Sequence, residues 1–315
     1  MKLSIIVPAY NEEGNLEKLY NTTKDILSNI SFEMIFVNDG SKDKTEKILN
    51  NLYENNKENI KVINFSRNFG KDAAIYAGLK KASGKYTAII DADMEQHPKY
   101  LLEMYNFLEE NNDYDQVAMV IKKRKKGSIF SRMGGKFFYR LMNKLSDIHF
   151  KEDASDFRMF RDYVKDAITS LPEKNRFSKG IFNWIGFQTK FMEYDVGTRY
   201  SGKTKFNFNK SFKYAIDGII GYSTKPLHIA TFLGLLCSLS SFLYLIYIII
   251  KTLILGIDIP GFATTVCLVL FIGGIQLICI GILGEYIAKT YIEVKNRPIY
   301  VSKSEKGFEK QKREN

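Results

Sequence analysis

The chain has 315 residues and a formal net charge of +11, from 46 Lys and Arg against 35 Asp and Glu side chains. This length is enough for one large domain or two ordinary ones. The three Cys all lie in apolar runs and do not indicate a disulfide framework, and the three His are scattered, which argues against a His-ligated metal site. The positive charge is typical of proteins that meet phosphates, an anionic membrane or nucleic acid, and does not choose among them.

The first ninety residues alternate between strand-like and helix-like patterns. Short apolar runs predict four strands, and runs with apolar residues at helical spacing predict three helices between them. The expected strands are 2–10, 32–40, 60–66 and 85–91, and the expected helices are 11–29, 44–56 and 71–83. This alternation predicts an α/β fold with a largely parallel sheet that is covered on both faces.

A polar segment follows each expected strand. The four segments are PAYNEE (8–13), NDGS (38–41), SRNFGK (66–71) and DADME (91–95). Ligands of parallel sheets bind outside the carboxyl ends of the strands. We therefore expect the four segments to converge on one edge of the sheet, where a mononucleotide would lie.

Asp91, Asp93 and Glu95 place three carboxylates at alternating positions directly after a buried strand. Three acids this close repel one another unless a cation compensates them. Oxygen ligands at a strand end suit Mg²⁺ or Mn²⁺, which also bridge to substrate phosphates. A D-x-D pattern also occurs in solvated acidic turns, so the interpretation depends on the three neighbouring strand-end segments.

Residues 122–140 contain eight basic side chains and no acidic one. The segment is either a solvated loop or a surface that meets anionic headgroups or a phosphate, with its aromatic side chains as interfacial anchors. The apolar spans further along the chain favour the second alternative, a surface that meets headgroups or a phosphate. No recognised nucleic-acid-binding module accompanies the segment, so nucleic acid is not an expected partner.

Two uncharged apolar runs, residues 229–250 and 262–284, follow near the C-terminus. A helix of about 22 residues is roughly 33 Å long and can cross a bilayer, and two adjacent runs argue against a buried helix of a soluble protein. Basic residues flank the pair, so the positive-inside rule predicts a cell-membrane protein with two spans and both termini in the cytoplasm. The N-terminal apolar run, residues 3–9, is too short for a signal peptide.

These patterns give the expected domain organisation. It consists of a cytoplasmic α/β domain (1–208), an amphipathic helix along the membrane surface (209–228), a two-span hairpin (229–284) and a cytoplasmic tail (285–315). The tail is expected to be partly disordered because its last residues are strongly charged.

Six motifs, in this order, resemble the family 2 glycosyltransferases of the GT-A fold. They are IIVPAYNEEGNL (5–16), VNDGSKDKT (37–45), SRNFGKDAA (66–74), DADMEQHP (91–98), DFRMF (156–160) and RYSGKTKFN (199–207). With the paired spans, the chain looks most like the polyprenyl-phosphate glycosyltransferases, such as the bactoprenol glucosyltransferases and the dolichyl-phosphate mannosyltransferases. The resemblance implies a Rossmann-like, mostly parallel sheet followed by an interfacial helix and two transmembrane helices.

The resemblance also implies roles for residues that match its motifs. The implied nucleotide-binding residues are Pro8, Tyr10, Glu12, Asp39, Lys71 and Asp91, and the implied metal ligands for Mg²⁺ or Mn²⁺ are Asp91, Asp93 and Glu95. In the family's archaeal members the position of Glu95 is typically Gln, which also approaches the metal. Arg67 is either a contact to the diphosphate or the base, or a surface charge.

The implied catalytic residues are Asp156, Arg199 and Lys205, and the implied contacts to an acceptor phosphate or lipid headgroup are Arg132, Arg176 and Lys203. Asp156 matches the family's proposed base. However, a polyprenyl phosphate has a second pKa near 6 and is largely dianionic at neutral pH, so it needs little help from a base. Orienting the acceptor or the sugar, or binding metal, are the alternative roles of Asp156.

The implied reaction is inverting transfer of a sugar from a nucleotide sugar to a polyprenyl phosphate, for glycosylation at the cell surface. UDP-glucose is the first choice of donor, followed by UDP-N-acetylglucosamine and GDP-mannose. The Lys-, Asn- and Ile-rich composition favours a low-GC bacterium and hence undecaprenyl phosphate. The family includes tetramers, which leaves a homo-oligomer open.

Three rival functions make different demands on the sequence. A processive polysaccharide synthase would carry a QxxRW motif and more spans, and neither is present in the sequence. An enzyme with a lipid hydroxyl acceptor, such as a diacylglycerol or ceramide, would depend strictly on Asp156. A non-catalytic membrane scaffold would not need Asp91, Asp93, Arg199 and Lys205, which are all intact.

Overall fold

The computed structural model describes residues 1–122, 154–197, 218–256 and 261–308. Eight strands form one sheet in the order β7-β5-β6-β4-β1-β2-β3-β8. The strands are β1 (Leu3–Ala9), β2 (Phe32–Asn38), β3 (Ile60–Phe65), β4 (Tyr86–Ile89), β5 (Gln116–Ile121), β6 (Ala154–Arg161), β7 (Thr189–Tyr194) and β8 (Ser302–Lys306). The pairs β1–β2, β1–β4, β2–β3 and β5–β7 are parallel, and the other three pairs are antiparallel. The predicted α/β class with a mostly parallel sheet is confirmed.

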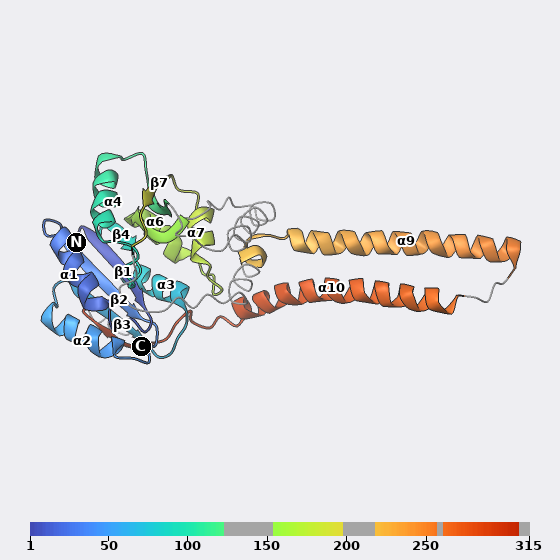
Figure 1. Cartoon of the computed structure of the whole chain (residues 1–315), viewed down its shortest axis with the longest axis horizontal. Coiled ribbons are helices and arrows are strands. Elements are labelled where there is room, and N and C mark those ends of the chain that lie inside the picture. Colours follow the sequence, from blue (N-terminus) through green and yellow to red (C-terminus); the bar gives the residue numbers. More distant parts are fainter. Residues whose placement is uncertain (123–153, 198–217, 257–260, 309–315) are drawn as a thin grey trace.

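Helices cover both faces of this sheet (Figure 1). They are α1 (Leu16–Ile26), α2 (Thr45–Asn55), α3 (Lys71–Lys81), α4 (Lys99–Glu110), α6 (Asp162–Ser170) and α7 (Ser178–Trp184). The central strands are apolar at nearly every position because both faces are buried: Ile5 packs with α1, α2 and α4, whereas Ile6 packs with α3, α6 and α7. Each predicted helix and strand of the first ninety residues is present, within a few residues of its expected ends.

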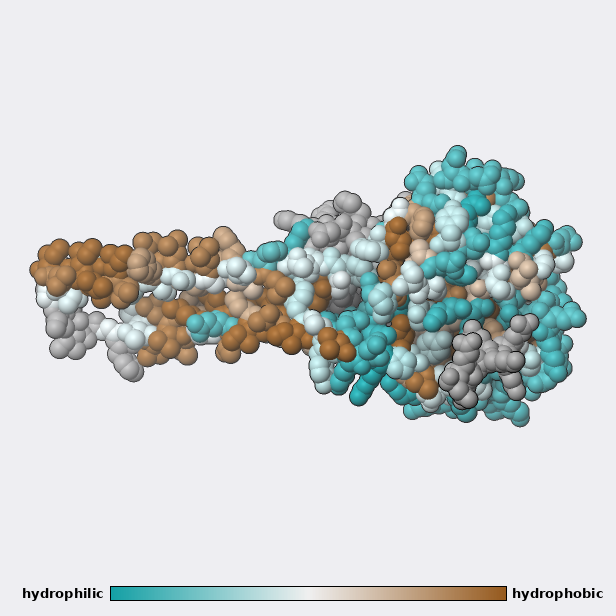
Figure 2. Space-filling view, turned by 180° about the vertical axis from the view of Figure 1, so that it is seen from behind, coloured by the Kyte–Doolittle hydropathy of each residue, from teal (hydrophilic) through white to brown (hydrophobic). Residues whose placement is uncertain are grey.

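Two long helices, α9 (Lys225–Leu255) and α10 (Phe262–Val294), lie side by side and project from one end of the globular part (Figure 1). Within them, Lys225–Ile254 and Thr264–Val294 are long and apolar enough to cross a membrane, and their most apolar stretches are not buried inside the protein. Figure 2 shows the resulting hydrophobic surface along the projecting hairpin. An apolar surface of this length needs a cover, and a lipid bilayer provides one.

The base of the hairpin contacts the globular domain at two places. Near α9, the Tyr222 ring packs on Phe177 with centroids 6.0 Å apart. Near the end of α10, the Glu293 carboxylate accepts hydrogen bonds from the backbone amides of Lys174 (2.9 Å) and Asn175 (3.0 Å). Since Phe177 directly precedes α7, both contacts reach the same connection between α6 and α7.

The C-terminal segment differs from its expectation. Helix α10 continues to Val294, past the predicted hairpin end at 284, and the expectation of disorder is wrong for Ser302–Lys306. These residues form β8, which pairs antiparallel with β3, and the nearby Ile299, Tyr300 and Phe308 pack against the core. Backbone pairing at a sheet edge does not require apolar side chains, so the charged composition was misleading. Residues 309–315 lie outside the described residues.

Two further predicted segments lie partly or wholly outside the described residues. The basic segment is described only at Lys122, and the surface helix only from residue 218, where residues 218–222 are helical. The surface helix at 209–228 and the remaining domain boundaries therefore stay predictions.

Candidate active site

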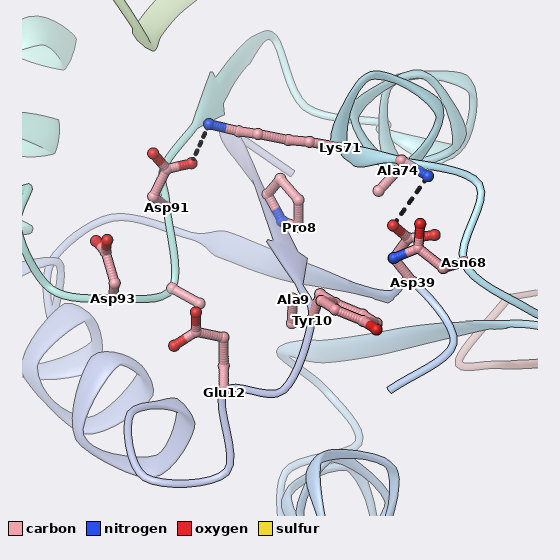
Figure 3. Close-up of a pocket in the computed structure, with 12 residues that line it drawn as sticks. Pro8, Ala9, Tyr10, Glu12, Asp39, Asn68, Lys71, Ala74, Asp91 and Asp93 are labelled. Carbon is pink, nitrogen blue, oxygen red and sulfur yellow. Dashed lines mark hydrogen bonds and ion pairs between the residues drawn. The ribbon is translucent and has the colours of Figure 1, made fainter. Parts of the chain in front are cut away.

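A pocket of about 320 Å³, the strand-end pocket, lies at the carboxyl ends of β1, β2, β3 and β4 (Figure 3). Its lining residues are Pro8, Ala9, Tyr10, Glu12, Asp39, Asn68, Gly70, Lys71, Ala74, Asp91, Ala92 and Asp93. All four polar segments contribute, which confirms the predicted convergence. All six residues predicted to bind the nucleotide line this pocket.

The first two loops of the pocket hold each other in place. The backbone amide of Asn11 donates to Ser41 Oγ (3.0 Å), and the amide of Glu12 donates to Thr45 Oγ1 (2.9 Å). In return, the amide of Lys42 donates to Asn11 Oδ1 (2.8 Å). Short polar side chains can thus satisfy backbone groups that leave the ends of the strands, which explains their concentration in NEE and SKDKT.

Asp39 organises the loop that follows β3. Its carboxylate accepts hydrogen bonds from the amides of Phe69 (2.6 Å) and Gly70 (3.0 Å), and only 3% of the residue is exposed. Burial raises the pKa of Asp39, against the opposing effect of these amides and of Arg67. Gly40 beside it has φ +65°, and a Cβ there would lie 2.3 Å from the backbone carbon of Arg67. The NDG sequence therefore fixes the position of the SRNFGK loop.

Lys71 joins two carboxylates from neighbouring strands. Its Nζ lies 2.6 Å from Asp91 Oδ1 and 3.0 Å from Asp156 Oδ2 (Figure 3 draws the first contact). Asp91 follows β4 and Asp156 lies on β6, which pairs with β4. Lys71 begins α3, so its side chain spans the gap between the helix and the strand ends. The sequence did not predict this bridge.

The bridge keeps Asp156 ionised. Burial alone would raise the pKa of this carboxyl, but Lys71 first, then Lys179 and Arg158, lower it to about 2. The same carboxylates raise the pKa of Lys71 above its ordinary value despite its desolvation. A carboxylate with a pKa near 2 accepts a proton poorly at neutral pH, so Asp156 is poorly suited to act as a general base.

Asp156 and Arg158 share a buried polar environment that is incompletely satisfied. Arg158 is 3% exposed, its guanidinium carbon lies 3.9 Å from the centre of the Phe182 ring, and burial lowers its pKa to about 10. Asp156 Oδ1 and Arg158 Nε are buried without a hydrogen-bond partner. The two-residue period of a strand puts the side chains of Asp156 and Arg158 on one face, so their proximity could have been predicted from the DFRMF motif.

The expected three-carboxylate metal site is not assembled. Asp91 and Asp93 line the strand-end pocket, but Glu95 does not. No group of three or more His, Cys, Asp or Glu side chains could hold a metal among the described residues. The chain turns at Met94 (φ 62°), where the amide of Glu95 donates to Asp93 Oδ1 (3.1 Å). This turn separates Glu95 from the pocket.

Two carboxylates nevertheless fit a divalent cation that takes its other ligands from a substrate. Mg²⁺ commonly binds through one or two carboxylates plus substrate phosphates and water. Asp91 and Asp93 provide such a pair at the pocket wall, and the ammonium of Lys71 offsets part of their charge.

The structure does not bring Arg176 into the pocket. Its guanidinium donates to the carbonyls of Leu171 (2.9 Å) and Ile168 (3.0 Å) at the end of α6, and lies 4.3 Å from the centre of the Tyr76 ring. These contacts cap a helix, because the last carbonyls of a helix lack partners within it. The predicted role in binding an acceptor phosphate is therefore not supported by its position.

The other predicted basic contacts cannot be placed. Arg132, Arg199, Lys203 and Lys205 lie outside the described residues, and their roles stay predictions.

Sequence reasoning missed Asn68 and Gly70 as pocket residues, although both belong to the SRNFGK segment. It also missed Lys179, for which no sequence signal was available.

Comparison with known proteins identifies the family. Residues 4–168 match the description of Glycosyl transferase family 2, and residues 225–290 match the GtrB C-terminal hairpin. The chain belongs to glycosyl transferase family 2. The resemblance seen in the six motifs is thereby confirmed.

Relatives match over nearly the whole chain. The bactoprenol glucosyl transferase of Shigella phage SfII is 40% identical over 308 residues, which cover 96% of this chain and 98% of the relative. An uncharacterized glycosyltransferase of Synechocystis sp., sll0501, is 41% identical over 303 residues, which cover 96% of this chain and 94% of the relative. Among solved structures, a mycobacterial protein aligns with a TM-score of 0.50 at 15% identity, over 70% of this chain and 72% of the other, a likeness of fold alone.

Proposed function

We propose that this family 2 enzyme transfers glucose from UDP-glucose to undecaprenyl phosphate, with inversion, at the cytoplasmic face of the cell membrane. The observation that carries the proposal is the strand-end pocket, where Asp91 and Asp93 lie beside the Lys71–Asp156 ion pair in a domain attached to an apolar hairpin. Support for the glucose and the polyprenyl acceptor comes from the relatives named bactoprenol glucosyl transferase. Both termini would lie in the cytoplasm and α9 and α10 would cross the membrane once each.

Different pocket residues would bind different parts of the donor. Tyr10, Glu12 and Asp39 would hold the nucleoside, at the ends of β1 and β2. Asp91 and Asp93 would hold Mg²⁺ or Mn²⁺, which neutralises the diphosphate and stabilises it as a leaving group. Lys71 begins α3 beside them, so its ammonium would also lie close to the diphosphate and offset part of its charge.

The proposed reaction needs no general base. An oxygen of the acceptor phosphate forms a bond to the anomeric carbon while the bond from that carbon to the diphosphate breaks. UDP departs with the electron pair, and no proton is transferred because the acceptor is already ionised. Asp156 would act through Lys71, by holding its ammonium at the junction of β4 and β6. Arg199 and Lys205 would offset the charge of the incoming phosphate. This role rests only on their match to the family motif.

Replacing Asp156 with Asn separates this mechanism from transfer to a lipid hydroxyl. With undecaprenyl phosphate we expect kcat to fall by less than about 10²-fold, since loss of a needed general base would cost about 10²–10⁴-fold. In both the wild type and the variant, the rate should rise with pH near 6, because the acceptor phosphate ionises there. Asp156 of the wild type does not contribute to this rise, because its pKa of about 2 keeps it charged throughout that range. The exposed Asp113→Asn variant is the matched control.

The decisive test of function is product formation. The purified protein in detergent would be incubated with undecaprenyl phosphate, Mg²⁺ or Mn²⁺ and a panel of UDP-glucose, UDP-N-acetylglucosamine and GDP-mannose, and mass spectrometry would detect a glycosylated lipid phosphate. We expect product from UDP-glucose only. If another donor gave the product, that donor and its sugar would take the place of UDP-glucose and glucose in the proposed reaction. Metal-dependent nucleotide binding without any product would favour a different acceptor or a scaffold.

Sedimentation of the same sample would determine the oligomeric state.

A further inference from the structure

A second cavity of about 490 Å³ lies where the end of α10 meets the catalytic domain. We call it the basic pocket, after four of its lining residues: Arg67, Lys174, Lys295 and Arg297. They come from three connections that are far apart in sequence, after β3, between α6 and α7, and after α10. No residue lines both this cavity and the strand-end pocket, so the basic pocket is a separate site.

The four basic side chains of this pocket form no direct ion pair within the part of the chain that the structure describes. Arg67 acts electrostatically on Asp39 from a greater distance. The Arg67 guanidinium lies 3.9 Å from the centre of the Phe69 ring, and Lys295 Nζ lies 4.2 Å from the centre of the Tyr291 ring. Aromatic faces attract cations without cancelling their charge, so the pocket remains attractive to anions.

Two acidic residues lie close by: Glu173, which directly precedes Lys174, and Glu293 on α10. The Glu293 carboxylate accepts hydrogen bonds from the backbone amides of Lys174 and Asn175 and so anchors the connection that carries Lys174. The four cations of the pocket outnumber these two carboxylates, so a net positive charge remains. A cluster of basic side chains around a cavity is the usual setting for a phosphate group.

The position along α10 relates this pocket to the membrane. The uncharged stretch of α10 ends at Glu285, and Tyr291 follows six residues later, roughly 9 Å further along the helix. A headgroup layer extends about 5–8 Å beyond the hydrocarbon core. Lys295 follows Glu285 by ten residues, roughly 15 Å along the helix, and its long stem can reach back toward the lipid phosphates.

We propose that the basic pocket binds the phosphodiester headgroup of an anionic glycerophospholipid. The lipid is not the acceptor, because its phosphate would lie outside the cavity that holds Asp91 and Asp93. The two cavities share the loop after β3, in which Arg67 and Phe69 line the basic pocket and Asn68 and Gly70 line the strand-end pocket. A bound headgroup would therefore hold one side of the loop whose other side faces the donor.

The test measures lipid binding without turnover, so it is independent of the proposed reaction. Full-length protein in detergent would be titrated with phosphatidylglycerol and with phosphatidylcholine, and bound lipid counted by native mass spectrometry. We expect one tightly bound phosphatidylglycerol. In the Lys295→Gln/Arg297→Gln variant its affinity should fall by about fivefold for each charge removed, or about 25-fold in total.

The matched control is Lys24→Gln/Lys47→Gln, which removes the same charge from exposed positions on α1 and α2 and should bind the lipid normally. Equal affinity in the pocket variant and the control would overturn the proposal, and so would equally tight binding of phosphatidylcholine. Binding of inorganic phosphate as tight as that of phosphatidylglycerol would reassign the pocket to a soluble phosphorylated ligand. The melting temperature checks the fold of each variant, and Lys174→Gln replaces any variant that fails this check.

Discussion

Asp91→Asn is expected to reduce glycosyl transfer by about 10²–10³-fold or more, the range seen when a group that stabilises developing charge is removed. The substitution removes a carboxylate that faces both the proposed metal and Lys71, whose Nζ is 2.6 Å away. An amide is a much weaker ligand for Mg²⁺ than a carboxylate, so metal-dependent UDP affinity should fall with the rate. Steady-state kinetics and calorimetric titration of UDP, with and without metal, measure both effects.

The control for this variant is Asp25→Asn, an exposed carboxylate on α1. It should leave both the rate and the affinity for UDP unchanged. In the Asp91→Asn variant, the new side-chain amide can keep the contact that Gln96 makes with Asp91, so the melting temperature should change little. A rate within tenfold of wild type would contradict the assignment of Asp91 to the leaving group.

Gly40→Ala should disable donor binding through the backbone alone. The residue has φ +65°, where a side chain costs roughly 1–2 kcal/mol, and the new Cβ would lie 2.3 Å from Arg67 C and 2.6 Å from Asn68 N. The loop after β3 must move away, and with it the two amides bonded to Asp39. We expect UDP affinity to fall by tenfold or more, since about 1.4 kcal/mol corresponds to tenfold.

Gly186→Ala separates strain from displacement of the loop. Gly186 has a similar φ of +71°, but the nearest atom to its new Cβ would be Trp184 O at 4.0 Å. This control should lower the melting temperature without changing UDP affinity. If both variants lowered UDP affinity equally, the effect of Gly40 would be global instability rather than displacement of the SRNFGK loop.

The central fold was predictable because one signal dominated it. Strands β1 to β4 are buried on both faces, so their runs of apolar residues are unambiguous, and the helices between them carry a clear apolar face. Strand β8 was missed because its side chains are charged and its contribution to the sheet is made by backbone hydrogen bonds to β3. Composition reports side-chain burial and does not report backbone pairing.

The donor side of the candidate site was predictable for a related reason. Residues such as Tyr10, Asp39 and Asp91 follow mutually parallel strands of one sheet, so topology brings them together. The contacts around Asp156 depend on distances that the sequence does not contain, including the bridge from Lys71. Arg176 matched a family motif, yet its guanidinium caps α6, because motif matching does not determine where a long side chain ends.

Docking the hairpin to the catalytic domain at both Tyr222 and Glu293 has a kinetic consequence. A domain on a single linker would sample many heights and orientations above the lipid surface, whereas two attachments fix both. The enzyme and a lipid acceptor would then meet by lateral diffusion in two dimensions. Turnover should follow the surface density of the acceptor, in moles per mole of total lipid, and should be insensitive to dilution of the vesicles in the buffer.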